Sequence, residues 1–291
     1  CGRMGQGIAI TFALAGYKIQ LIDIKKRSND NFTNLLIKIN SEISKNLKIL
    51  NKIKLINKNK IKKITSNIEI MQYWSNENII NSADIIFECV PEKLKIKKNV
   101  FKLLSENTNK KTIISSTTST ILSTDLAKYN RHPERFLNAH WLNPPYLMPL
   151  IEISPCKETS KSNIKKIYNL FIKIGKVPII CKPSPGYIVP RIQSLAMNEA
   201  ARILEEGAAS AEDIDKSVIY GFGLRFAILG LLEFIDWGGI DTLDNASSYM
   251  TKTMKSQRFS TPSIVKKHIK NNNLGLSTHC LLYTSPSPRD S

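Results

Sequence analysis

Residues 1–24 read CGRMGQGIAITFALAGYKIQLIDI, and the order of features in this stretch decides the fold class. Three glycines come first, and apolar residues with helical spacing follow them. Gly16 ends the predicted helix, Ile19–Ile22 has the composition of a buried strand, and Asp23 lies at the end of that strand. Glycines, a helix, a strand and an acid in this order predict the start of an α/β domain.

The glycines also predict a ligand. With one glycine placed before Cys1, the segment would read G-C-G-R-M-G, which matches the G-x-G-x-x-G pattern of dinucleotide-binding turns. Glycines at such a turn let the backbone approach a pyrophosphate at a helix N-terminus. Gly2, Met4 and Gly5 are therefore candidate contacts of a dinucleotide. The first strand and the first glycine of the unit would precede Cys1, so we expect the sequence to begin inside the motif.

Asp23 favours one dinucleotide over the other. It lies about 20 residues after the glycines, where a carboxylate accepts hydrogen bonds from the adenosine ribose. A carboxylate there repels a 2′-phosphate, so NAD is favoured over NADP. Lys25, Lys26 and Arg27 weaken this preference, because nearby cations could accommodate the phosphate. The alternative interpretation of Asp23 is an ordinary acid at a strand end.

The rest of the chain predicts two domains. Strands and helices alternate as far as Val177–Cys181, which indicates an α/β fold with a Rossmann-type, doubly wound parallel sheet. Beyond that strand only helical patterns remain; Gly207 ends the first of them and Ser210 begins the next. We expect an NAD-binding domain over 1–183 and an all-α C-terminal domain over 184–279.

Both ends of the sequence predict a gene fragment. The tail CLLYTSPSPRD, which begins at Cys280, is what a transposon-type sequencing adapter encodes, so residues 280–291 are excluded from the fold. The run LGLSTH passes directly into this tail, so the helical domain is expected to be truncated. The first strand expected before Cys1 would lie at the centre of the sheet. We therefore expect the fragment to be unstable.

The composition bounds the function classes. The net charge of +18 invites a nucleic-acid interpretation, but Lys, Asn and Ile dominate the basic run 25–63, and A/T-rich codons encode all three. The run contains one aromatic residue, Phe32, so stacking of bases has little support. No apolar run approaches the ~20 residues of a membrane span. The five cysteines form no C-x-x-C pair, so no metal site is expected and a reducing, cytoplasmic location is favoured.

His140 is the candidate catalytic residue. It stands at the end of the apolar strand 136–140, is followed by Asn143 and two prolines, and precedes Glu152 by twelve residues. Oxidation of an alcohol by NAD needs a base for the hydroxyl proton, and histidine titrates near neutral pH. A carboxylate on the second ring nitrogen would fix the tautomer. The other histidines, His132, His268 and His279, lie in polar stretches, although a loop histidine with one hydrogen-bond partner remains the alternative for His140.

Six segments in order carry a family resemblance, and a seventh run indicates the type within the family. The chain resembles the NAD-dependent L-3-hydroxyacyl-CoA dehydrogenases, and the last of the segments resembles the short-chain, 3-hydroxybutyryl-CoA type. The segments are GRMGQGIA (2–9), FECVPEKLKIKKNVF (87–101), SSTTST (115–120), HWLNPPYLMPLIE (140–152), PGYIVPRI (185–192), ASAEDIDKSV (209–218) and GFGLRFAILGLLEFIDWGG (221–239).

The resemblance implies roles for further residues. His140 corresponds to the family's base and Glu152 to the acid that orients it. Ser119 corresponds to the hydroxyl that contacts substrate and nicotinamide. Glu92 and Lys97 correspond to positions near the nicotinamide-side ribose. The remaining implied contacts are a loop asparagine beside the cofactor (Asn143), an acyl-CoA substrate that the basic helical segment after residue 28 contacts, and a homodimer formed through the helical domain.

Without the resemblance, several of these residues have ordinary explanations. Ser119 could cap the next helix, Glu92 could interact with a helix dipole, and Asn143 could belong to a turn before proline. The family commonly has an active-site asparagine where this chain has Pro190, so one substrate contact is lost or supplied differently. Proline is acceptable in the first turn of a helix.

The sequence is also compatible with two other functions. One is an NAD-dependent dehydrogenase of a free hydroxy acid such as gulonate, which would use the same histidine without CoA. The other, more distant, is a basic protein that binds nucleotides or nucleic acid and has no use for His140. Oxidation of NADH by acetoacetyl-CoA distinguishes the enzyme of CoA esters from both.

Overall fold

The computed structural model describes residues 1–75 and 77–282. Most of the tail expected to derive from an adapter, 283–291, lies outside the described residues, as does residue 76. By internal contacts the chain divides into two compact units, Cys1–Leu195 and Ala196–Ser291. The division falls inside helix α7 (Val189–Glu205). Each unit is described by itself.

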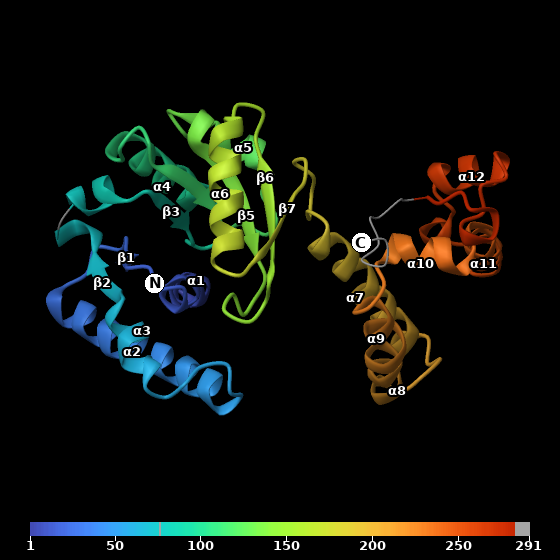
Figure 1. Cartoon of the computed structure of the whole chain (residues 1–291), viewed down its shortest axis with the longest axis horizontal. Helices are drawn as coiled ribbons and strands as arrows, with labels where there is room; N and C mark the ends of the chain where they lie inside the picture. Colours follow the sequence, from blue (N-terminus) through green and yellow to red (C-terminus); the bar gives the residue numbers. More distant parts are fainter. Residues whose placement is uncertain (76, 283–291) are drawn as a thin grey trace. The chain divides into compact units, whose positions relative to one another are not determined.

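The first unit alternates helices and strands, as the sequence predicted (Figure 1). Its helices are α1 (Arg3–Leu14), α2 (Asn29–Lys52), α3 (Lys60–Ser66), α4 (Leu94–Asn107), α5 (Ser123–Ala127) and α6 (Lys161–Lys173). Its strands are β1 (Ile19–Asp23), β2 (Ile68–Gln72), β3 (Ile85–Glu88), β4 (Ile113–Ser116), β5 (Phe136–Trp141), β6 (Leu150–Pro155) and β7 (Val177–Ile180). Local sequence explains several ends: Ser28 and Ser160 cap α2 and α6 by accepting amide hydrogen bonds, and Gly16 adopts a φ of 87° after α1.

The strands form two sheets within the described residues. One pairs β1 with β2 in parallel, and the other has the order β3-β4-β5-β6-β7. Every pair in the larger sheet is parallel except β5 with β6, which is antiparallel. The expected parallel sheet is confirmed, and its one reversal has a physical reason. Only residues 142–149 separate β5 from β6, and a connection that short joins antiparallel strands, whereas a parallel crossover needs a dozen or more residues.

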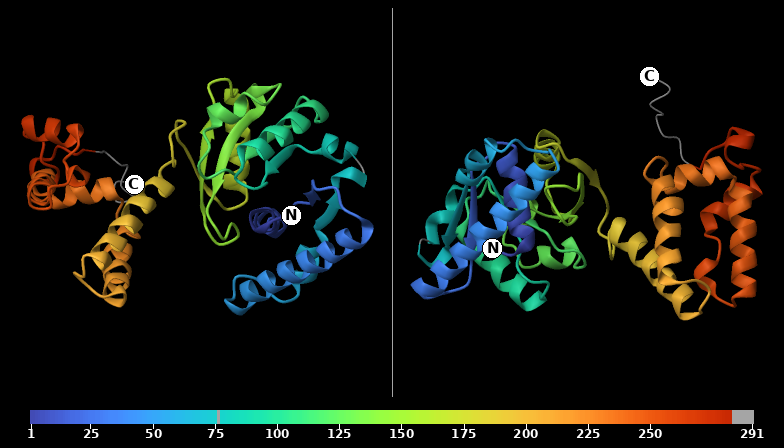
Figure 2. Two further views of the ribbon diagram at one scale, coloured as in Figure 1. Left: turned by 180° about the vertical axis from the view of Figure 1, so that it is seen from behind. Right: turned by 90° about the horizontal axis from the view of Figure 1, so that it is seen from below.

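Helices cover both faces of the larger sheet, which is the doubly wound arrangement. On one face, Ile114 of β4 packs in a cluster with Phe101 of α4. On the other, Leu137 of β5 packs with Phe12 of α1 and Phe171 of α6. Figures 1 and 2 show α4 and α6 on opposite sides of the strands. Ile113 and Ile114 are neighbours on β4, and they pack in the two different clusters because side chains alternate between the faces of a strand.

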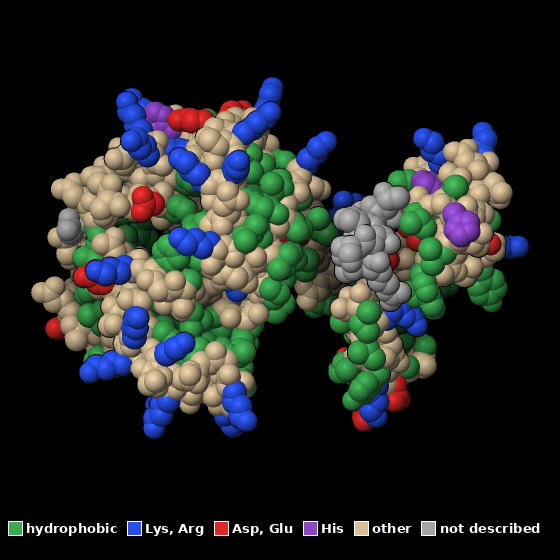
Figure 3. Space-filling model, in the orientation of Figure 1, with side chains coloured by type: hydrophobic (Ala, Val, Ile, Leu, Met, Phe, Trp, Pro, Cys, Tyr) green, Lys and Arg blue, Asp and Glu red, His purple; other side chains and the backbone are tan. Residues whose placement is uncertain are grey.

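The basic segment after residue 28, predicted to be helical, forms two helices, α2 and α3. Its apolar side, with Ile39, Ile43 and Leu47 of α2, packs against α1 and β1. The lysines of the pair lie on the other side and contribute to the basic side chains spread around the first unit in Figure 3. The apolar spacing along α2 therefore explains both its docking and the exposure of its charge.

The second unit is helical, as expected. It contains most of α7 and then α8 (Ala211–Ser217), α9 (Leu224–Phe226), α10 (Leu231–Gly238), α11 (Ile240–Thr253) and α12 (Ser263–Lys270). The predicted start at Ser210 is confirmed, because its side chain accepts the Asp213 amide hydrogen bond. Pro190 is the second residue of α7, where its missing amide hydrogen costs no helical bond.

Many large apolar side chains of the second unit are exposed, among them Tyr220, Ile228 and Trp237. Figure 3 shows such apolar side chains on its surface. In the part of the chain that the structure describes, no single helix meets the length and hydropathy of a membrane span, and one bent helix pair, Ala211–Phe226 with Leu231–Gly238, meets them jointly by length and composition alone.

Candidate active site

His140 and Glu152 lie directly opposite each other on the antiparallel strands β5 and β6. The distance from His140 Nδ1 to Glu152 Oε2 is 2.7 Å. Both residues are buried, with exposed fractions of 5% and 0%. The twelve-residue spacing noted in the sequence thus becomes a cross-strand pair, because the short hairpin folds β6 back along β5.

Backbone amides bind the second oxygen of Glu152. Its Oε1 accepts hydrogen bonds of 2.9 Å from the amides of Ile188 and Val189, at the start of α7. Burial raises the pKa of Glu152, but the bonds from His140 and from these two amides outweigh burial and lower that pKa below its ordinary value. Glu152 is therefore a carboxylate at neutral pH. His140 Nδ1 donates to it, which leaves Nε2 to exchange a proton with a ligand.

Ser119 and Asn143 lie in loops near this pair. Ser119 is exposed in the loop that follows β4, and Asn143 is exposed in the loop that follows β5, before the cis peptide bond to Pro144. Since β4 and β5 are parallel neighbours, both loops leave the same edge of the sheet. That edge, at the carboxyl ends of the strands, is where open α/β sheets bind ligands.

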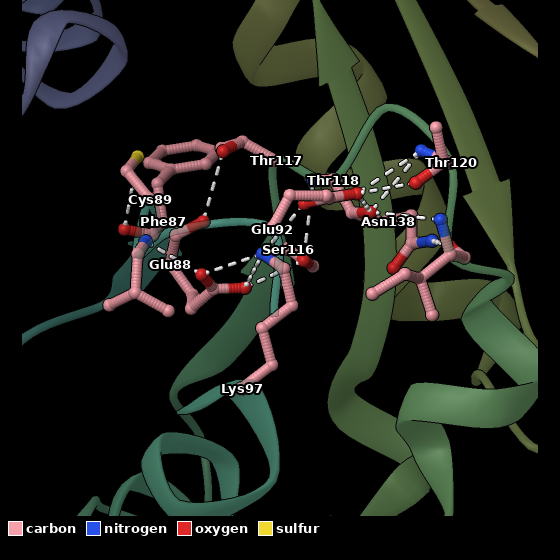
Figure 4. Close-up of polar contacts among 12 residues, drawn as sticks. Phe87, Glu88, Cys89, Glu92, Lys97, Ser116, Thr117, Thr118, Thr120 and Asn138 are labelled. Carbon is pink, nitrogen blue, oxygen red and sulfur yellow. Dashed lines mark hydrogen bonds and ion pairs between the residues drawn. The ribbon is translucent and has the colours of Figure 1, made fainter. Parts of the chain in front are cut away.

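A buried ion pair stands at the end of β3. Lys97 of α4 is 1% exposed, and its Nζ lies 2.9 and 3.0 Å from the two carboxylate oxygens of Glu88, which is 3% exposed (Figure 4). The Ser116 hydroxyl of β4 donates to the same carboxylate at 2.7 Å, and the Val90 amide donates at 2.8 Å. A buried charge needs a partner and hydrogen bonds, and Glu88 has both.

Glu92 links this ion pair to the Ser119 loop. Its Oε2 lies 3.3 Å from Lys97 Nζ, and its Oε1 accepts hydrogen bonds from the hydroxyls of Thr118 and Thr120. Burial raises the pKa of Glu92, but the bonds from Thr118 and Lys97 outweigh burial and lower that pKa. Lys97 is enclosed by two carboxylates, whereas the Glu92 side chain is 36% exposed. Of the two predicted ribose contacts, Glu92 is the one with surface for a ligand.

The N-terminus of α1 fits an anion such as a pyrophosphate. Gly2 is the N-cap residue, and no side chain of the described residues caps this turn. A Cβ at Gly2 would meet no heavy atom within 4 Å, whereas one at Gly5 would lie 3.4 Å from Leu21 of β1. Open space therefore adjoins the N-cap residue, while the helix packs closely on the strand one turn later. Met4 is partly buried beside them.

Asp23 occupies its predicted place at the end of β1, and a basic side chain binds it. Arg27 Nε lies 2.5 Å from Asp23 Oδ2, and Asp23 is buried. One of the three cations that weakened the preference for NAD in the sequence is thus paired with the acid. The pairing neutralises the positive charge nearest to Asp23.

The hairpin loop between β5 and β6 is held from two sides. Lys176 is buried, and its Nζ donates hydrogen bonds to the carbonyls of Pro145 at 2.6 Å and Met148 at 2.9 Å. From the other side Gly7 of α1 approaches Pro145 so closely that a Cβ on Gly7 would lie 2.6 Å from Pro145 Cδ. The helix expected to bind the cofactor therefore packs against the loop that follows His140.

Replacement of Gly7 by alanine is expected to destabilise the protein. Helix propensity favours alanine by about 1 kcal/mol, but the added methyl group would lie 2.6 Å from a proline ring atom, so we expect an overpacking cost of about 2–3 kcal/mol, the upper part of the usual range. We expect a net loss of about 1–2 kcal/mol in the free energy of unfolding, measured by urea denaturation. The control is Gly238→Ala at an exposed helical position with nothing within 4 Å, where stability should stay equal or rise. If Gly7→Ala were as stable as Gly238→Ala, the close packing of Gly7 against Pro145 would be contradicted.

Comparison with known proteins assigns the family. Residues 1–184 match the family described as 3-hydroxyacyl-CoA dehydrogenase, NAD binding domain, and residues 186–285 match its C-terminal domain. The chain belongs to the 3-hydroxyacyl-CoA dehydrogenase family. The protein is accordingly an NAD-dependent oxidoreductase, and the resemblance inferred from the seven segments is confirmed.

The proteins most useful for comparison match between 65% and 99% of this dehydrogenase. A 3-hydroxybutyryl-CoA dehydrogenase of Clostridioides difficile is 31% identical over 97% of this chain and 96% of its own length. The 5-formyl-3-hydroxy-2-methylpyridine 4-carboxylate 5-dehydrogenase of Mesorhizobium japonicum is 30% identical over 65% of this chain, and the match spans 61% of that protein. A solved 3-hydroxyacyl-CoA dehydrogenase of Archaeoglobus fulgidus is 27% identical, with a TM-score of 0.75 over 99% of this chain and 91% of that one.

Some residues of the site were missed in the sequence of this dehydrogenase. The signal for Glu88 was present, since it is an acid inside the apolar strand DIIFECV. Thr118 and Thr120 sit in a run of hydroxyl residues in which spacing alone distinguishes none. Tyr187, Ile188 and Val189 lie in the segment PGYIVPRI, but the sequence did not indicate their contacts with β5 and β6, because these join segments more than 30 residues apart.

Proposed function

We propose that the protein interconverts short-chain L-3-hydroxyacyl-CoA and 3-ketoacyl-CoA, with His140 and Glu152 as the acid–base pair. The observation that carries the proposal is the buried bond between His140 Nδ1 and the Glu152 carboxylate, which leaves the second ring nitrogen for the substrate. The relative from Clostridioides difficile, a 3-hydroxybutyryl-CoA dehydrogenase, supports the short acyl chain.

In the oxidising direction, His140 Nε2 takes the proton of the 3-hydroxyl group. Glu152 keeps His140 in the required tautomer and stabilises the imidazolium that forms. Ser119 donates a hydrogen bond that positions the reacting oxygen. NAD supplies the hydride acceptor in this direction. In the reverse direction His140 returns the proton to the ketone oxygen as the carbonyl is reduced.

The proposed NAD contacts lie in two places, at the start of α1 with the end of β1, and in the loops that follow β3 and β5. Gly2, Met4 and Gly5 would hold the pyrophosphate, and Asp23 would bind the adenosine ribose beside Arg27. The nicotinamide-side ribose would contact Glu92, which Lys97 holds in place, and the set is completed by Asn143.

The partners in this proposal are an acyl-CoA and a second copy of the chain. Exposed lysines on α2 and α3 offer a positive surface for CoA phosphates. The exposed apolar side chains of the helical domain, taken as residues 184–279, support a homodimer, since a surface with many exposed apolar side chains suits burial against a partner. Five free cysteines support a cytoplasmic location.

The test is oxidation of NADH followed at 340 nm with the purified protein. The proposal predicts rapid turnover with acetoacetyl-CoA, and a lower kcat/KM with a long-chain 3-ketoacyl-CoA. A preference for the long chain would overturn the short-chain assignment. Reduction of NAD with a free hydroxy acid such as gulonate, in place of activity on the CoA ester, would overturn the substrate class and point to the contact that Pro190 cannot make.

A further inference from the structure

Tyr187 stacks on the proposed catalytic histidine. The two ring centroids are 5.0 Å apart and the ring planes are inclined by 8°. Tyr187 is buried, with an exposed fraction of 6%, in the segment that connects β7 to α7. Its φ of 49° lies in the left-handed region, which a bulky residue adopts only where its surroundings hold it.

The hydroxyl of Tyr187 holds the Ser119 loop. It donates a 2.9 Å hydrogen bond to the carbonyl of Thr118 and accepts one of 3.0 Å from Asn138 Nδ2. Asn138 Nδ2 in turn donates to the carbonyl of Ile121 at 2.9 Å. The loop is thus tied down on each side of Ser119, once directly by Tyr187 and once through Asn138.

The two residues that follow Tyr187 bind Glu152, the second member of the acid–base pair. Ile188 and Val189 donate their amide hydrogens to Glu152, as described above. Three consecutive residues therefore contact the His140 ring and the Glu152 carboxylate. Glu92 also holds the Ser119 loop, by accepting a hydrogen bond from the Thr118 hydroxyl.

We propose that Tyr187 is a positioning residue, which fixes the plane of the His140 ring and the place of the Ser119 loop relative to each other. This inference rests on the proposed function. Tyr187 is not itself an acid in the reaction, because its proton is donated to the Thr118 carbonyl. Burial raises the pKa of Tyr187 far above its usual value, so the hydroxyl stays a donor over the working pH range.

The test compares two variants. Tyr187→Phe keeps the stacked ring and removes the hydroxyl, and we expect kcat with acetoacetyl-CoA to fall about 3- to 10-fold, the scale of one hydrogen bond. Tyr187→Leu removes the aromatic ring as well, and kcat should fall further. The Kd for NADH, measured by fluorescence quenching, should stay within about twofold of the parent in both, because the proposed contacts of the pyrophosphate and of the adenosine ribose lie at α1 and at Asp23, which Tyr187 does not hold. Tyr168→Phe, on α6, is the control and should leave kcat unchanged.

A proton NMR measurement distinguishes positioning from general stability. The His140 ring protons, assigned by comparison with His140→Gln, should show a ring-current shift that Tyr187→Phe retains and Tyr187→Leu loses. Unchanged kcat in Tyr187→Phe, or an unchanged His140 signal in folded Tyr187→Leu, would overturn the proposal. If Tyr187→Leu does not fold, the kcat of Tyr187→Phe decides alone. A parent protein that fails to reduce acetoacetyl-CoA contradicts the proposed function, while the NMR shifts still decide whether Tyr187 orders His140.

Discussion

The His140→Gln variant is expected to reduce acetoacetyl-CoA with a kcat about 10²- to 10⁴-fold lower than the parent, which is the scale of a lost general acid–base. Glutamine can still hydrogen-bond to Glu152 and roughly fills the site, but it has no proton to exchange near neutral pH. The measurement is steady-state oxidation of NADH, with the Kd for NADH determined separately by fluorescence quenching. That Kd should not change, because His140 lies on β5 and the proposed pyrophosphate site lies at α1.

The chain offers a matched control for this variant. His132 Nδ1 also lies beside a glutamate, 3.3 Å from Glu134 Oε1, but the His132 side chain is 31% exposed and lies outside the sheet. His132→Gln should keep full activity. A loss below about tenfold in His140→Gln, or equal losses in both variants, would contradict the assigned base, because acid–base catalysis contributes at least about 10²-fold.

The pH dependence of Glu152 can be predicted from its environment. Because hydrogen bonds lower its pKa in the folded protein, Glu152 stays ionised from pH 5 upward, and its protonation should not limit activity there. Its contribution to stability is present above the pKa of the unfolded chain, about 4.3, and is lost as the pH falls through the lower folded value. Glu152→Gln should therefore lower kcat at pH 7 and reduce the acid-side slope of stability in urea denaturation. An unchanged slope would show that Glu152 gains no such stabilisation.

Periodicity and local chemistry were sufficient for most of the fold. Alternating strands and helices predicted the doubly wound sheet, and the serine at position 210 predicted a helix start, because both signals act over a few residues. The antiparallel direction of β6 was not predicted, although its cause, the short link 142–149, was visible in the sequence. That direction turned a histidine and a distant glutamate into a cross-strand pair.

The missed parts of the site depend on contacts between distant segments. Glu88 forms an ion pair with Lys97 because α4 folds back over β3, and Tyr187 stacks on His140 because the chain returns to β5 after β7. The periodicity of the sequence does not predict such contacts between distant segments. A buried acid in an apolar strand does signal that a cation must be supplied from elsewhere, and this rule would have led from Glu88 to a partner.

Lys97→Met is expected to have the largest effect on stability, a loss of about 3–5 kcal/mol in the free energy of unfolding, because it leaves the Glu88 carboxylate buried without a counter-charge. Urea denaturation measures the loss, and Lys95→Met on the exposed side of α4 is the control that should change stability by less than about 0.5 kcal/mol.

A second substitution tests whether the unpaired charge causes that loss. In Glu88→Gln combined with Lys97→Met the charge is gone, while the glutamine oxygen can still accept hydrogen bonds from the Ser116 hydroxyl and the Val90 amide. The double variant should therefore recover much of the stability that Lys97→Met loses. If it is no more stable than Lys97→Met, the effect comes from packing around the lysine stem, and the ion pair is not what stabilises the end of β3. Recovery of stability with a persistently weaker Kd for NADH would mean that Lys97 also holds Glu92 in place for the cofactor.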